Sequence, residues 1–89
     1  MNQQEFENTL KQGQYGEVLT KHQLGDYYMG EHSHPFDARA LIIAGEITLT
    51  VAGRVQSYPT GSIFELAKGT VHEERAGPEG VTYLVGRRT

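Results

Sequence analysis

The sequence predicts an all-β fold: an antiparallel sandwich or barrel preceded by one short helix. Short segments rich in Val, Ile, Thr and Tyr follow one another after residue 15, and glycines and prolines separate them. No helical period persists in that part of the chain. With 89 residues the chain is long enough for one domain and too short for two. We therefore expect one domain over residues 1–89, with the helix in 1–13 and the barrel in 15–88.

The first dozen residues carry the signals of a helix. Asn2 is a favourable N-cap, and Glu5 stands where a capping box places its carboxylate. Phe6 and Leu10 form an apolar pair one turn apart. Gly13 is expected to end the helix.

The clearest strand covers residues 46–52, where Ile47, Leu49 and Val51 alternate with threonines. This period of two predicts a strand with one buried face. Gly53 then predicts a tight turn into a second strand over 54–58. Further strands are predicted over 17–23, 27–34, 39–44, 62–66, 71–75 and 81–86, those at 39–44 and 81–86 being central because both faces are apolar.

Composition narrows the function and the partners. The chain has no cysteine, so disulfides and thiolate metal sites are excluded, and histidine and carboxylate remain as strong ligands. A net charge of −3 offers no basic surface for nucleic acid. Residues 1–11 are polar and resemble neither a signal peptide nor a membrane anchor. We expect a cytoplasmic protein that binds neither nucleic acid nor membrane.

Three histidines form a candidate metal site. His32 and His34 stand two apart in an extended segment, so their side chains leave the same face about 6.6 Å apart. His72 lies on another predicted strand, where closure of the barrel would place it opposite this pair. Neutral imidazole is a good ligand, and three such ligands leave open positions for water or substrate. The alternative interpretation is a solvated turn that Pro35 ends.

The residues around these histidines resemble the conserved motifs of the cupin superfamily. Residues 25–37 with 41–46 resemble the first motif, including the paired histidines, the proline after them and the glycine-glutamate pair at the end of the next strand. Residues 61–72 resemble the second motif, with its leading glycine, its Gly-Thr turn and its final histidine. The motifs are in order and lie 15 residues apart, an arrangement typical of small cupins.

This resemblance implies a double-stranded β-helix, or jelly-roll, cupin barrel. It also implies that His32, His34 and His72 hold a divalent metal ion such as Zn, Fe, Ni or Mn. The glutamate ligand that cupins usually supply, four residues after the second histidine, is replaced by Ala38. Its loss makes the site more positive and favours an anionic substrate. Asp37 and His22 are the two further candidates for a fourth ligand, although regular alternation turns Asp37 away.

Strand alternation also predicts what surrounds the metal. If Ala38 faces inward, then Ala40, Ile42 and Ala44 do so too, and these mostly small side chains leave room for a ligand. Tyr28 shares the parity of His32 and is the candidate catalytic residue, as hydrogen-bond donor or proton shuttle; the alternative is a core aromatic. Arg39 and Glu74 are interpreted as surface residues, either of which would anchor an anionic substrate if it faced the barrel mouth.

Two functions fit this sequence. The first is a metal-dependent enzyme of the dioxygenase or isomerase type that acts on a small organic or anionic substrate. The second is a non-catalytic module that binds a small ligand or senses a metal. A homodimer is expected in either case, because Leu41 and Ile43 on an outer strand face need cover.

Overall fold

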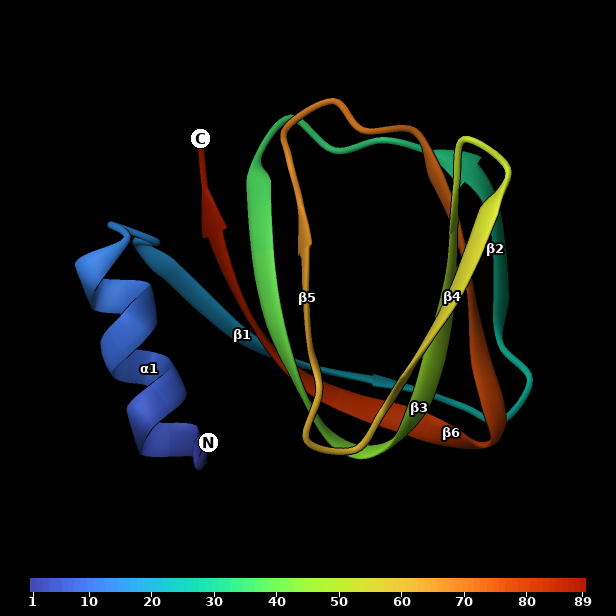
Figure 1. Cartoon of the computed structure of the whole chain (residues 1–89), viewed down its shortest axis with the longest axis horizontal. Coiled ribbons are helices and arrows are strands. Elements are labelled where there is room, and N and C mark those ends of the chain that lie inside the picture. Colours follow the sequence, from blue (N-terminus) through green and yellow to red (C-terminus); the bar gives the residue numbers. More distant parts are fainter.

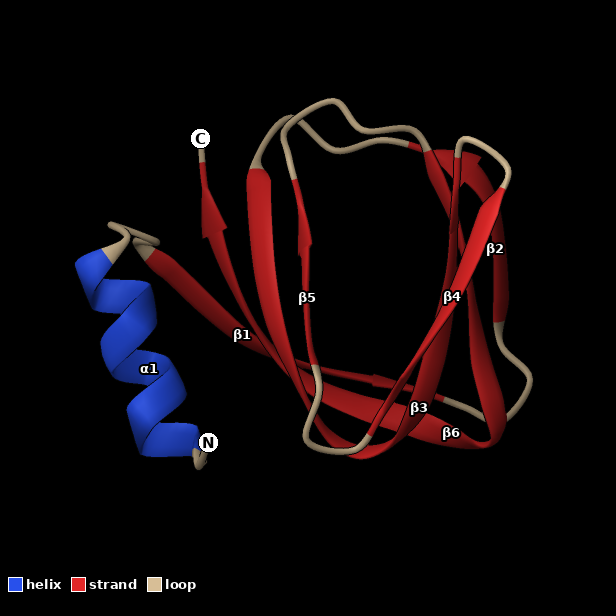
Figure 2. Ribbon diagram, viewed as in Figure 1, coloured by secondary structure: helices blue, strands red, loops and turns tan.

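A computed structural model describes residues 1–89 as one helix outside a barrel of six strands (Figures 1 and 2). The all-β prediction is confirmed, and so is the short N-terminal helix. The elements are α1 (Gln3–Gln12), β1 (Glu17–Gln23), β2 (Tyr28–His32), β3 (Asp37–Val51), β4 (Arg54–Pro59), β5 (Ile63–Leu66) and β6 (His72–Arg88).

Two long strands, β3 and β6, build both layers of the barrel. The first half of β3 pairs with the second half of β6, and β5 and β1 complete this layer on either side. The second half of β3 pairs with the first half of β6, and β4 and β2 complete the other layer. All these pairings are antiparallel, as in a double-stranded β-helix. The sequence predicted separate strands at 39–44 and 46–52, and again at 71–75 and 81–86. In the structure the first two form the single strand β3, and the last two form the single strand β6.

The two long strands bend at glycines where they cross from one layer to the other. Gly45 and Gly80 have φ angles of +76° and +85°, which glycine adopts without strain. A Cβ atom on Gly45 would lie 2.1 Å from the carbonyl oxygen of Gly80, so the backbones approach too closely for any side chain. The β3–β6 register shifts beside Gly45. These glycines therefore mark bends within continuous strands rather than strand ends.

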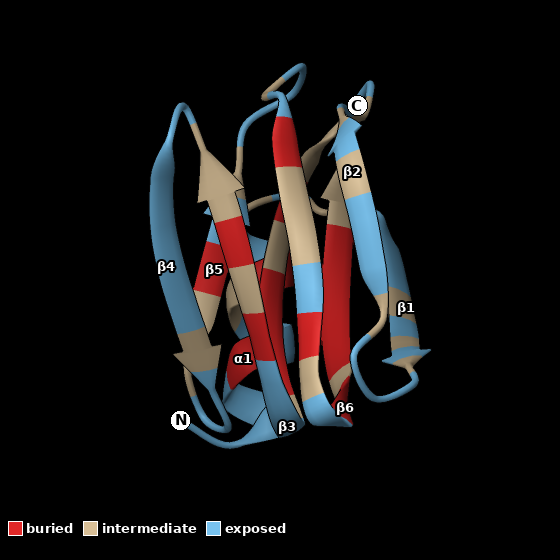
Figure 3. Cartoon of the chain, turned by 90° about the vertical axis from the view of Figure 1, so that its right-hand side faces the viewer, coloured by how far each residue is buried: buried red, intermediate tan, exposed pale blue.

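The core lies between the two layers. The buried residues of β3 and β6 lie on either side of their bends, whereas the bends themselves, at 44–46 and 78–79, and most of β4 are exposed (Figure 3). Ala38, Ala40 and Ile42 face inward as predicted. Ala44 does not: it is exposed, because the register shift between Ile42 and Ala44 breaks the alternation.

The helix α1 covers the outer face of the first layer. The capping box is formed as predicted, with Asn2 and Glu5 exchanging side-chain to backbone hydrogen bonds. Phe6 and Leu10 are fully buried against Leu41 and Leu84, in a cluster that also includes the half-buried Ile43. No helix is long and apolar enough to cross a bilayer.

This packing removes the reason given for a homodimer. Leu41 is only 3% exposed in the single chain, because the chain's own helix covers the strand face that a partner was expected to cover. Ile43 packs at the edge of the same cluster. A homodimer stays a prediction, but it would have to use another surface.

Candidate metal centre

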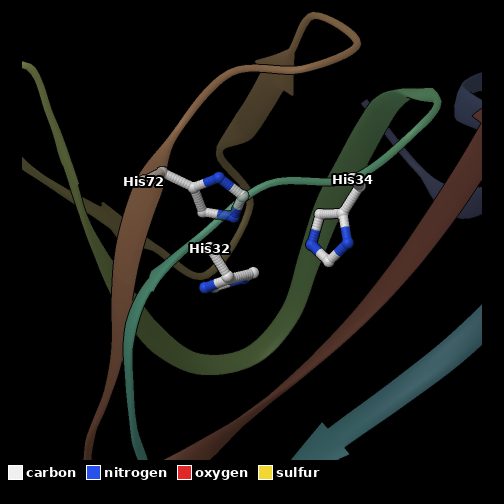
Figure 4. A group of neighbouring side chains, drawn as sticks. All are labelled: His32, His34 and His72. Carbon is white, nitrogen blue, oxygen red and sulfur yellow. The ribbon is translucent and has the colours of Figure 1, made fainter.

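The three histidines converge at one end of the barrel (Figure 4). His32 ends β2 and pairs directly with His72, which begins β6, while His34 follows in the loop after β2. Their nearest ligand atoms all lie within 4.8 Å of one another. The turned chain between β2 and β3 brings His34 over the other two, with ring centroids 4.9 Å from His32 and 5.3 Å from His72.

Backbone carbonyls orient two of the imidazoles. The Nδ1 atom of His32 lies 2.7 Å from the carbonyl oxygen of Gly30, and Nδ1 of His72 lies 2.9 Å from that of Thr70. A carbonyl only accepts, so each Nδ1–H donates and each neutral ring carries its lone pair on Nε2. Both Nε2 atoms are buried and have no hydrogen-bond partner. Buried polar atoms are normally paired, so these two lone pairs are suited to bind a cation.

His34 is held in the form that binds metal. Burial is the main cause that lowers the pKa of His34 below its ordinary value. Nearby positive charges lower it further, from His32, His72, Arg87 and Lys21. Its ring stacks on Phe36 with centroids 4.9 Å apart. A neutral imidazole is therefore available at ordinary pH.

A carboxylate that sequence reasoning placed on the surface faces the histidines. Glu74 Oε2 lies 3.6 Å from Nε2 of His72 and 3.8 Å from Nε2 of His32, and its side chain is only 12% exposed. Strand alternation could have found it, because Glu74 stands two residues after His72 on β6 and so shares its face. The site is less positive than the loss of a glutamate at position 38 suggested.

Tyr28 lies outside the site, contrary to the prediction. Met29 and His32 pair with residues two apart on β6 although they are three apart on β2, so a bulge adds one residue between them. The bulge turns Met29 toward the interior with His32, and Tyr28 outward. The Tyr28 hydroxyl instead donates to Glu73 at 2.5 Å, and this hydrogen bond raises the pKa of Tyr28.

The two further ligand candidates also lie elsewhere. Asp37 accepts a hydrogen bond from the backbone of Lys68 at 2.8 Å and two from Arg88 at 3.0 and 3.1 Å, so both its oxygens are engaged away from the histidines. His22 is exposed on the outer face of β1, where its Nδ1 lies 2.9 Å from the hydroxyl of Thr82. Regular alternation explains both positions, because Ala38 and Lys21 take the inward places beside them.

The histidines open onto a cavity of about 230 Å³ between the two layers. Ala38, Phe64 and Val85 line its apolar side, and Lys21 and Arg87 supply positive charge. Its lining also includes Tyr27, Met29, Tyr83 and Glu74. Burial is the main cause that raises the pKa of Tyr83, so its hydroxyl stays protonated and can only be a neutral donor or acceptor.

The residues present fit a divalent metal ion. Two ligand atoms about 2.1 Å from one ion in tetrahedral arrangement lie about 3.4 Å apart, close to the 3.6 and 3.8 Å between Glu74 and the histidines. These separations are too long for hydrogen bonds. Imidazole nitrogen and carboxylate oxygen suit Zn, Fe, Ni and Mn.

No protein-family model matches the chain, and no curated protein matches its sequence significantly. Solved structures do match. A cupin-2 domain protein from Shewanella frigidimarina aligns with a TM-score of 0.66 and 17% identity over 80% of this chain and 69% of its own. The cupin domain of Schizosaccharomyces pombe Cnp3 aligns with a TM-score of 0.73 and 15% identity, over 81% of this chain and 54% of its own. Oxalate decarboxylase from Bacillus subtilis aligns with a TM-score of 0.72 and 17% identity, over 80% of this chain and 20% of its own. The chain has the cupin fold.

Proposed function

We propose that this protein is a small metal-binding cupin that acts on a small organic anion, as an enzyme of the dioxygenase or isomerase type. The observation that carries this proposal is the pair of buried Nε2 lone pairs of His32 and His72, which converge with His34 and have no partner. A divalent ion held there would supply a Lewis-acid centre with open positions for substrate oxygen.

The chain's own groups prepare the site for such a ligand. The carbonyls of Gly30 and Thr70 fix the tautomers and ring directions of His32 and His72. Phe36 and the apolar wall at Phe64 and Val85 exclude water from one side of the cavity. The Tyr83 hydroxyl, kept protonated by burial, is available to donate a hydrogen bond to a bound oxygen atom.

Two cationic side chains support an anionic substrate. Lys21 and Arg87 both line the cavity and lie close enough to lower the pKa of His34. Arg87 is held in place by the ring of Phe36, 4.5 Å from its guanidinium carbon, and by Glu17 at 3.2 Å. Its Nε atom is buried without a partner. A small carboxylate or enolate of a few carbon atoms matches this charge and a cavity of about 230 Å³.

One observation favours the second function, a non-catalytic module that binds a small ligand or senses a metal. The pKa of Tyr83 is raised away from neutrality, so this tyrosine is suited to hold a ligand rather than to shuttle protons. Such a module would use the same histidines and the same cavity. Turnover is therefore the property that separates the two functions.

Elemental analysis of protein purified without a histidine tag tests metal binding. We expect close to one divalent ion per chain. His72→Ala should abolish the signal, because it removes a buried ligand atom that has no other partner. His22→Ala is the matched control and should keep the ion, because His22 is exposed on the outer face. Loss of the ion in both variants would refute this set of ligands.

A substrate screen then tests catalysis. The protein is reconstituted with Fe(II), Ni(II), Mn(II) or Zn(II) and assayed against diketones, thiols and sugar acids. The enzyme function is supported if a small anion is turned over, if this turnover requires the metal, and if Arg87→Gln reduces its rate. Saturable binding of such an anion without turnover under any of the four metals would favour the sensing or binding module.

A further inference from the structure

The cavity contains one acidic side chain, and it comes from an unexpected strand. Ala38 on β3 faces the cavity, but its methyl group cannot bind a metal. Glu74 also lines the cavity, from β6 in the opposite layer. The carboxylate therefore belongs to the layer that contributes His32 and His72, and the side of Ala38 is left without a ligand.

The direction of Glu74 follows from the strand pairing rather than from a chance rotamer. Glu74 pairs with Met29 on β2 and with Leu49 on β3, whose side chains both face the interior. Paired residues of antiparallel strands project to the same face. The neighbour Glu73 projects to the opposite face, where it accepts the hydrogen bond of Tyr28.

The surroundings of Glu74 favour a bound cation. Its Oε2 atom faces two imidazole nitrogens that are hydrogen-bond acceptors, because their Nδ1–H groups are already committed to carbonyls. A carboxylate against two lone pairs is repulsive, and its side chain is largely withdrawn from water. No lysine or arginine forms an ion pair with it; its only ion-pair neighbours are the two histidines. A divalent cation satisfies all three atoms at once.

We infer that Glu74 is the carboxylate ligand of this centre and supplies from β6 the negative charge that position 38 does not supply from β3. This inference rests on the proposed metal-binding function. The resulting set, three imidazole nitrogens and one carboxylate oxygen, suits Fe(II), Mn(II) or Ni(II) as well as zinc. The side of the cavity at Ala38 would then carry no ligand and, with the apolar wall at Phe64 and Val85, would leave room for a substrate.

The test compares two adjacent glutamates on the same strand. Metal dissociation constants are measured by competition with a chelator for the wild type, Glu74→Gln, Glu73→Gln and His72→Ala. Glutamine keeps the shape of glutamate and removes its charge. We expect Glu74→Gln to weaken the binding of Mn(II) and Fe(II) more than about a hundredfold, beyond the roughly 10- to 100-fold that loss of an outer partner of a ligand typically costs. Glu73→Gln should change affinity less than about twofold, because its carboxylate faces outward.

Two further readouts do not depend on activity. The visible absorption bands of bound Co(II) should shift in Glu74→Gln and stay in place in Glu73→Gln, because only the first changes the coordination sphere. Metal-free Glu74→Gln should unfold at the same temperature as the wild type or higher, since the Glu74 carboxylate is withdrawn from water and forms no ion pair with a lysine or arginine that the substitution would break. A lower unfolding temperature would indicate a structural role instead.

The outcomes separate this inference from the proposed function. If the wild type binds no metal, the proposed function fails and the inference fails with it. If the wild type binds, His72→Ala loses the ion, and Glu74→Gln keeps both the affinity and the Co(II) spectrum, the centre stands on histidines alone and the inference is overturned.

Discussion

His32 and His72 lie directly opposite one another where β2 meets β6, with ring centroids 4.2 Å apart. An ion bound between them would join two strands that are about forty residues apart in the sequence. A ligand that binds only the folded state stabilises it by about 2.7 kcal/mol at a concentration one hundred times its dissociation constant. We expect metal to raise the unfolding temperature by about 10–20 °C.

Calorimetry with and without a chelator measures this effect. His72→Ala should lose the metal-dependent increase, whereas His22→Ala should keep it, because His22 contacts Thr82 on the outer face. An equal increase in both variants would mean that the ion binds elsewhere.

A second prediction moves the carboxylate across the cavity. Ala38 and Glu74 line the same cavity from opposite layers. In the Glu74→Gln background, Ala38→Glu should recover part of the lost affinity for Mn(II), because a carboxylate again faces the histidines. Chelator competition on the single and double variants gives the coupling between the two positions. Additive losses in the double variant would show that position 38 does not reach the ion.

A third prediction concerns Asp37, whose pKa is lowered by the backbone N–H of Lys68 and then by Arg88. A lowered folded pKa stabilises the protein above the unfolded value of about 3.9, and this contribution disappears as the pH falls through the lower folded value. Asp37→Asn should therefore reduce stability at about pH 7, and the difference from wild type should shrink as the pH falls below the unfolded value of about 3.9.

Urea unfolding over a pH series measures that difference. Asp26→Asn is the control, because Asp26 is an exposed aspartate on a turn. Metal affinity should be unchanged in Asp37→Asn, because its oxygens contact Lys68 and Arg88 rather than the histidines. A weaker metal site in this variant would contradict the structure.

A fourth prediction uses two glycines with nearly the same backbone angle. Gly45 and Gly53 have φ angles of +76° and +78°. A Cβ on Gly45 would meet the carbonyl oxygen of Gly80 at 2.1 Å, whereas one on Gly53 would meet nothing within 4 Å. Both alanine variants carry the cost of a positive φ, about 1 kcal/mol, and only Gly45→Ala adds a collision of two strands.

Thermal unfolding should show Gly53→Ala folded with a modest loss of stability. Gly45→Ala should be far less stable or fail to fold. Equal losses in the two variants would mean that the close approach of β3 and β6 relaxes easily.

Local signals in the sequence predicted the parts of this fold that depend on local physics. Asn2, Glu5 and the pair Phe6 and Leu10 predicted the helix, its cap and its buried face, and the structure shows all three. The cupin barrel and the convergence of the histidines also followed from the sequence, because the two motifs stand in order at the right spacing. Ala38 faces inward as expected.

The errors arose where the strands depart from regular alternation. The bulge in β2 turned Tyr28 outward, and the register shift in β3 exposed Ala44. Bulges depend on how two strands pair, which a single segment does not reveal. Glu74 was missed for a different reason: its parity with His72 was available, but a charged residue on a short predicted strand is usually solvated.

The pairing of β3 with β6 also bears on the stage of folding at which the three histidines come together. These two strands form the centre of both layers, and each pairs with residues far away in the sequence. Chains dominated by such distant pairings refold in milliseconds to seconds rather than microseconds. The reason is that the entropy cost of closing long loops comes before the stabilising contacts form. His32 and His72 meet only when β2 docks on β6. We therefore expect the histidine cluster to form late in refolding, together with the barrel.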